Sequence, residues 1–375
     1  YTLEDESLKG PQTITVVAED YVVTTWFGAN GANVTIPLEA EATPDVPQAL
    51  LEGTIAGRDD LATPEQNKFL LGLVSYSHTD ELGDPANEID QPSVGGGLPA
   101  NACVKHTAGS QCDWDLNARA GNIAIYASII EVDTKGTPTN DDDDTHEIIG
   151  YAYDLDVTVE DGVDQSGLSL EQAEIGALTD VTVEVEDPPS GLTEVGVLIG
   201  LNLGDPGIML LGLQQDPDAS FELALPKLEG DFADAVYRVT GYATTNFEAE
   251  DSPASVIVER GLTDLASPFE LADWFPLAKN LALSGGEYSF TGVDGVSFHV
   301  VDFRGAGNDK VWDVALVDNR TAFSLPGLDP DPLPSGSYDM TVGAFDVTID
   351  TSDFSVDELT DTFTRISNAR ETLTP

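Results

Sequence analysis

The sequence predicts an all-β chain of tandem β-sandwich modules that ends in a short helix. Between residues 287 and 349, successive runs alternate apolar and polar side chains with a period of two, which is the pattern of half-buried antiparallel strands. Glycine, proline, asparagine or aspartate separates each run from the next, as turns require. At 375 residues, 41% of them hydrophobic, the chain is too long for one ordinary sandwich and indicates about two to four modules.

The net charge limits the partners that the chain can bind. There are 68 acidic residues against 15 basic ones, giving a formal charge of -53, and such a surface repels nucleic acid phosphates. Like charges repel over about 10 Å at 0.1 M salt, so high salt or divalent cations would relieve this repulsion. Two interpretations stay open: a saline or calcium-rich habitat, or acidity that keeps a secreted protein soluble. No apolar run is long enough for a transmembrane helix, no signal peptide is recognised, and Tyr1 in place of Met suggests a processed or truncated chain.

The first forty residues contain the expected strands 12–18, 21–27 and 33–38. The stretch GPQTITVVAEDYVVTTWFGANGANVTIPLE resembles the second half of a carboxypeptidase-regulatory-like (transthyretin-like) β-sandwich, in which a strand, an xGY step, a strand, a turn and VTIPL follow one another. The usual glycine before the tyrosine is Asp20 here. The resemblance implies a partial module over residues 1–40, with a secreted or cell-surface accessory role and no catalysis of its own. For the modules as a whole we expect immunoglobulin-like or transthyretin-like sandwiches.

A linker rich in proline spans residues 41–49, where two prolines disfavour both helix and central strand. A second module is expected over residues 48–165. A long irregular insertion, 80–116, interrupts its strands, and insertions of this length are usually stapled or functional.

Cys103 and Cys112 lie in this insertion, nine residues apart. As a disulfide they would close a short loop, contribute about 2 to 3 kcal/mol and indicate an oxidising compartment. As metal ligands they would have His106 as their near partner, but a zinc site needs four ligands at a recognisable spacing. The disulfide is the favoured interpretation.

The second half of the chain repeats a pattern of strands. Residues 220–226 and 236–243 have counterparts about a hundred residues later, in 322–326 and 337–345. The repeat predicts two sandwich-like modules, although β patterning could also produce it by chance. Their expected bounds are 177–260 and 262–352.

The last segment, 353–371, is predicted to form the C-terminal helix. Ser355 and Glu358 have the spacing of a capping box, and the apolar residues that follow share one helical face. Such a helix would pack on the last sandwich or serve as an interaction segment for a partner. The apolar stripe consists of Val356, Leu359, Phe363 and Ile366.

Reaction chemistry is hard to find in the sequence. It contains no nucleophile elbow, H-E-x-x-H motif, P-loop or dinucleotide fingerprint, so no catalytic or cofactor-binding residue is predicted. Glycoside hydrolysis needs only two carboxylates about 5 to 9.5 Å apart, and the sequence favours no pair among its acids. His299 alternates with apolar residues in a predicted strand, which favours a core position. The remaining histidines, His78, His106 and His146, are scattered singly.

One acidic loop is a candidate cation site. Asp141, Asp142, Asp143 and Asp144 lie together between two expected strands, and clustered carboxylates suit calcium. The spacing does not match an EF-hand, and a solvated acidic loop tip explains the run equally well.

Three functions follow, in order of preference. The first is a non-enzymatic secreted or cell-surface structural protein, a subunit of an extracellular assembly or filament that associates through β edges or the C-terminal helix. The second is a calcium-assisted module for carbohydrate, ligand binding or adhesion. A glycoside or other hydrolase ranks third.

Overall fold

The structure, a computed structural model, confirms that the protein is all-β. The described residues form 23 strands in four sheets, and they add one 3₁₀ turn, Gly230–Phe232. Within this part no helix has the length and apolar character needed to cross a membrane. The described residues are 10–31, 34–41, 46–56, 67–78, 100–105, 112–136, 145–172, 178–215, 220–247, 249, 252–265, 267–305, 307–352, 354 and 362–375.

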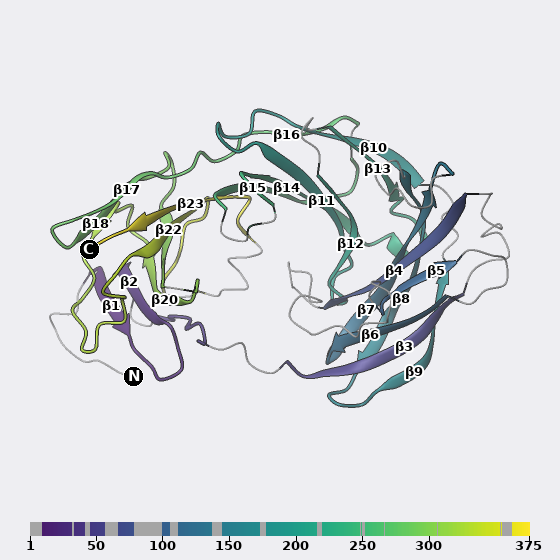
Figure 1. Ribbon diagram of the computed structural model, residues 1–375, viewed down its shortest axis with the longest axis horizontal. Helices are drawn as coiled ribbons and strands as arrows, with labels where there is room; N and C mark the ends of the chain where they lie inside the picture. Colours follow the sequence, from purple (N-terminus) through teal and green to yellow (C-terminus); the bar gives the residue numbers. More distant parts are fainter. Residues whose placement is uncertain are drawn as a thin grey trace.

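A ten-stranded sheet, called the large sheet below, forms the arch seen in Figure 1. Its neighbouring strands are antiparallel except for β2 and β20, which are parallel. In spatial order it contains β1 (Gln12–Val16), β2 (Val23–Ala29), β20 (Lys310–Leu316), β19 (Phe298–Arg304), β22 (Tyr338–Phe345), β23 (Arg365–Leu373), β15 (Ala254–Leu262), β14 (Val236–Thr244), β11 (Glu194–Asn202) and β12 (Ile208–Gln215).

Two three-stranded sheets cover the convex side of this arch (Figure 1). One core forms where Phe221 meets Val197 and Val239 of the large sheet, and the other where Phe290 meets Val301 and Val342. The period of two in the sequence thus gives each strand of the large sheet one apolar face for these cores. The first small sheet has the order β13 (Ser220–Pro226), β10 (Leu178–Val185), β16 (Phe269–Leu271), and the second β17 (Lys279–Ser284), β18 (Glu287–Thr291), β21 (Ala322–Phe323).

The large sheet contains an internal duplication. From the middle of the sheet outward, one half has the order β15-β14-β11-β12 and the other half the order β23-β22-β19-β20. Strands at the same place in these two orders also hold the same place along the chain within their half. Strands β15 and β23 pair antiparallel where the two halves meet. In each half the third strand along the chain, β13 or β21, belongs to one of the two three-stranded sheets and not to the large sheet. Phe221 of β13 and Phe323 of β21 are both buried. The two copies of the sequence pattern therefore occupy equivalent places, related by an approximate two-fold axis.

The large sheet crosses the module boundaries expected from the sequence. It combines strands from residues 1–40, 177–260 and 262–352, and the second copy of the repeat is completed by β23, which lies beyond residue 352. The parallel pairing of β2 with β20 joins the N-terminal hairpin to the far end of the chain.

The prediction of a C-terminal helix is wrong for the part of residues 353–371 that the structure describes as regular secondary structure. Arg365–Leu373 is strand β23, hydrogen-bonded between β22 and β15. Ser367 and Ala369 are buried, so a period of two prevails over the helical stripe that included Ile366. Pairing with β22 along the strand, and with β15 over residues 365–368, satisfies backbone groups of β23, which outweighs local helix propensity. Ser355, Val356, Glu358 and Leu359 lie outside the described residues.

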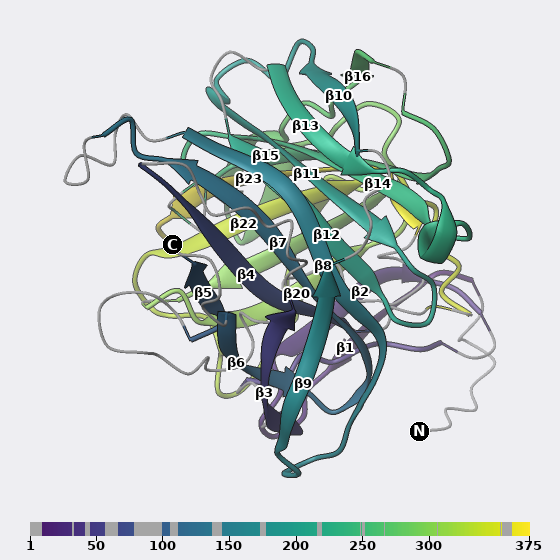
Figure 2. The ribbon, with the colours of Figure 1, turned by 90° about the vertical axis from the view of Figure 1, so that its right-hand side faces the viewer.

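The remaining sheet curls into a barrel, shown in front of the large sheet in Figure 2. Its two end strands, β5 and β6, are joined by the Cys103–Cys112 disulfide, with a Cα–Cα distance of 5.1 Å, and by a hydrogen bond from Asp115 N to Ala100 O. The disulfide prediction is confirmed, and its role is to close the barrel. The strand order is β5 (Ala102–Lys105), β4 (Lys68–His78), β7 (Gly121–Asp133), β8 (Thr145–Val159), β9 (Gln165–Gln172), β3 (Gln48–Ala56), β6 (Cys112–Arg119).

Candidate functional site

Strand β1 forms one end of the large sheet and is firmly attached on its inner side. It pairs with β2 over its whole length, and Thr15 Oγ1 lies 3.0 Å from Thr25 Oγ1. Thr25 in turn accepts a hydrogen bond of 3.0 Å from the buried Trp312 Nε1 on β20. In the described residues no strand pairs with the other side of β1. An edge strand of this kind can pair with a strand of another chain.

This edge is free of charged residues. From Gly10 to Ala18 the sequence GPQTITVVA has no charged residue, although the chain carries a net charge of -53. Thr13 is exposed, and Val17 is 61% exposed, the largest value among the exposed large apolar residues of the described chain. Threonine, isoleucine and valine favour strands, and β1 lacks the lysines that usually discourage edge pairing. We call residues 10–18 the open edge.

The opposite end of the large sheet, β12, is covered by the barrel. The hydroxyl of Tyr126 accepts a hydrogen bond from Leu210 N at 3.0 Å, and the Tyr151 hydroxyl donates to Leu211 O at 3.1 Å. Ser77 Oγ donates to the carbonyl of Pro206 in the turn before β12, at 2.7 Å. Barrel side chains therefore satisfy backbone groups that another strand would otherwise use.

A cluster of charged residues fastens the segment after β2 to the sheet. Lys310 Nζ lies 2.6 Å from Glu39 Oε2 and 3.4 Å from Asp302 Oδ1. Asp302 is directly opposite Asp313 across β19 and β20, and Arg304 Nη2 lies 3.9 Å from Asp302 Oδ2. The cluster anchors the hairpin that bears the open edge, because Glu39 follows that hairpin in the chain.

Electrostatics within this cluster favour one shared proton. Burial raises the pKa of Asp313, and the negative charge of Asp302 raises it further. Burial alone would lower the pKa of Lys310, but Asp302 and Asp313 hold that pKa above its usual value. Oδ1 of each aspartate is buried and has no hydrogen-bond partner in the described residues. A proton on Asp313 avoids two facing negative charges.

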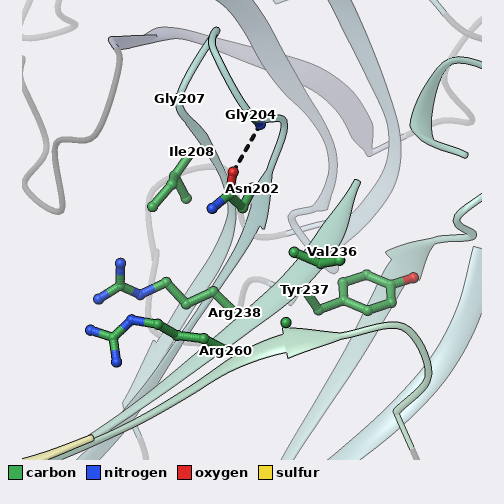
Figure 3. Close-up of a pocket in the computed structure, with 9 residues that line it drawn as sticks. Asn202, Gly204, Gly207, Ile208, Val236, Tyr237, Arg238 and Arg260 are labelled. Atoms are coloured by element: carbon green, nitrogen blue, oxygen red, sulfur yellow. Dashed lines mark hydrogen bonds between the residues drawn. The ribbon is translucent and has the colours of Figure 1, made fainter. Parts of the chain in front are cut away.

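A cavity of 230 Å³ lies where β11 turns into β12, beside the ends of β14 and β15. Arg238 and Arg260 extend side by side along it, and the Tyr237 ring points away from them (Figure 3). Arg260 Nη1 donates to Phe363 O, and its guanidinium lies 5.1 Å from the centre of the Phe363 ring. These contacts give Arg260 a structural role, joining the end of β15 to the segment that leads into β23.

A group of three carboxylates belongs to the first outer sheet. Glu184, Glu186 and Glu270 each offer an oxygen within 4.8 Å of the others. Glu184 and Glu270 are partners across the parallel pair β10 and β16. Glu186 and Glu270 are exposed, and a sequence search for consecutive acids could not have found the group, because strand pairing brings it together. Exposed carboxylates at this spacing are ordinary in so acidic a chain.

The structure describes only part of the predicted site residues. Cys103 and Cys112 are joined, as expected. Asp141, Asp142, Asp143 and Asp144, the predicted calcium ligands, lie outside the described residues, as does His106, so calcium binding stays a prediction.

His299 is a core residue, in agreement with its place in the sequence pattern. It is 1% exposed, its ring centre lies 5.2 Å from that of Phe290, and in the described residues neither ring nitrogen has a hydrogen-bond partner. Burial lowers the pKa of His299 to about 4. The neutral ring is therefore the form that the fold accommodates.

This burial predicts a loss of stability in acid. Between pH 6.5 and 4 the unfolded chain binds a proton at His299 that the folded chain excludes, so the free energy of unfolding falls as the pH falls through this range, by about 3 kcal/mol. His299→Leu should remove that contribution. Urea unfolding of both proteins at pH 7 and pH 4.5 tests this, and an equal loss in both would contradict it.

Comparisons with known proteins identify no family. No family model matches the chain, and no curated protein matches it. Among solved structures, it is similar to the FN1–FN3 domains of chicken CNTN1, with 10% sequence identity, 98% of each chain covered and a TM-score of 0.18. That score is too low to support any argument about fold or function.

Proposed function

We propose that this chain is a non-enzymatic structural protein of an extracellular or cell-surface environment, and that it assembles by strand pairing at the open edge. The carrying observation is the uncharged strand β1 at one end of the large sheet, in a chain of net charge -53. In the described residues no strand pairs with its outer side. The disulfide between Cys103 and Cys112 fits an oxidising compartment.

Salt should control this assembly. Two copies of so acidic a chain repel each other at low ionic strength, and the Debye length falls from about 10 Å at 0.1 M to about 3 Å at 1 M salt. The open edge brings no charge of its own into the contact, so association requires screening only of the surrounding carboxylates. A saline habitat would supply that screening.

The test places negative charge on the open edge. Thr13→Glu combined with Val17→Glu should lower the association constant at molar salt by at least tenfold, because paired edges would bring like charges together. Light scattering after size exclusion measures the mass of each species.

Val163 provides the matched control. It is 48% exposed and lies in the turn between β8 and β9, away from the large sheet. Val163→Glu combined with Thr158→Glu changes the charge equally and should leave association unchanged. If both double variants associate like the unchanged chain, the open edge is not the assembly surface.

A further inference from the structure

Edge strands decide how many copies can join, and the large sheet has two ends with different surroundings. At β12, Tyr126 and Tyr151 already use backbone groups of the strand. At β1 nothing in the described residues pairs with the outer side. A second copy could therefore extend the large sheet at β1 but not at β12.

The other sheets offer poorer edges. The ends of the barrel sheet, β5 and β6, are bridged by the Cys103–Cys112 disulfide. On β13, the carbonyl of Glu222 accepts a hydrogen bond from Gln214 Nε2 at 3.1 Å, and the carbonyl of Pro226 accepts one from the Tyr237 hydroxyl. Side chains thus cover the outer side of β13.

The remaining edge strands are short or irregular. Strands β16 and β21 have three and two residues. Strand β17 contains a register shift between Lys279 and Ala282 and begins with the exposed Lys279. Edge lysines discourage pairing. Strand β1 has a register shift of its own, between Gln12 and Thr13, but it carries no charge, which leaves β1 as the favourable edge among the described strands.

A single favourable edge determines the symmetry of the complex. A filament formed by edge pairing needs two complementary edges, one for each neighbour, whereas a surface that binds its own copy closes with two-fold symmetry. Resting on the proposed function, we infer that β1 pairs antiparallel with β1 of a second copy, so that the assembly is a closed dimer with one continuous sheet of twice ten strands. The open edge suits this partner because it is uncharged and two such edges meet without like-charge repulsion.

The duplication within the large sheet shows the same geometry inside one chain. Strands β15 and β23 hold equivalent positions in the two halves and pair antiparallel about the approximate two-fold axis, with Ser255 opposite Ser367. Edge pairing of equivalent strands is thus already part of this architecture.

Cysteine crosslinking of the full-length chain tests the inference at molar salt. Single cysteines are placed in turn at each of residues 13 to 17, and the native disulfide leaves both natural cysteines engaged. In an antiparallel two-fold pair, identical residues meet only near the axis. Oxidation should therefore link a variant to itself at one central position, while mixtures of variants from either side of that position should link to each other.

The outcomes separate this inference from the proposed function. A mass of two chains together with crosslinks confined to a central position supports the dimer. Self-crosslinks at all same-face positions would show parallel pairing and overturn it, as would growth beyond two chains, although β1 would still be the assembly surface. A single-chain mass at every salt concentration would overturn the proposed function as well.

Discussion

Replacing Gly53 by alanine is expected to destabilise the barrel by about 3 kcal/mol, because the added methyl group has no space. A Cβ atom at this position would lie 2.5 Å from the ring of Trp114 and 2.6 Å from the backbone carbonyl of Leu168. Trp114 is 1% exposed and sits opposite Gly53 across β3 and β6. The ring and a neighbouring strand would both have to move.

Urea unfolding at molar salt, followed by tryptophan fluorescence, measures this effect. Gly327→Ala is the matched control, because a Cβ atom there meets no atom within 4 Å, and its free energy of unfolding should change by less than about 0.5 kcal/mol. A Gly53→Ala protein as stable as the control would contradict the described packing of Trp114 over β3.

Asp313→Asn is expected to abolish a loss of stability that the unchanged chain suffers as the pH rises from about 4 to about 8. The folded state retains a proton on Asp313 that the unfolded state releases near pH 4, because burial and Asp302 raise the pKa in the fold. Stability supplied by this group is complete below pH 4 and is lost as the pH rises through the raised pKa. Since each pKa unit is worth about 1.4 kcal/mol, the loss should reach a few kcal/mol.

Asparagine at position 313 keeps a hydrogen-bond donor beside Asp302 at every pH, so the variant should become relatively more stable as the pH rises from 5 to 9. The exposed Asp309 lies just before β20, and Asp309→Asn makes the same side-chain change outside the pair. Thermal melting across this pH range measures the differences. Parallel stability profiles for Asp313→Asn and the unchanged chain would show that the pair shares no proton.

Local sequence patterns were enough to predict individual strands and the disulfide. The period of two around Phe298 and Val301 and the strands near Tyr338 follow from alternation alone, and the spacing of Cys103 and Cys112 sufficed to predict their disulfide. The segment that contains Ile366 was wrongly predicted to be a helix, because its capping box and apolar spacing fit one. In the structure β15 and β22 lie on either side of this segment and pair with it as strands.

The candidate site depends on contacts that no local pattern contains. Thr25 and Val314 are neighbours only because β2 lies parallel to β20, and Asp302 faces Asp313 only in one register of β19 and β20. The sequence identified β1 as a strand, but its position at an open end of the sheet depends on the order of all ten strands. The covering of β12 by Tyr126 likewise needs the packing of the barrel against the large sheet.

The most direct test of the central claim is the mass of the unchanged chain in solution, measured by light scattering from low to molar salt. We expect one chain at low salt, where the charge of -53 keeps copies apart, and two chains once that charge is screened. A mass of one chain at every salt concentration would contradict assembly through β1.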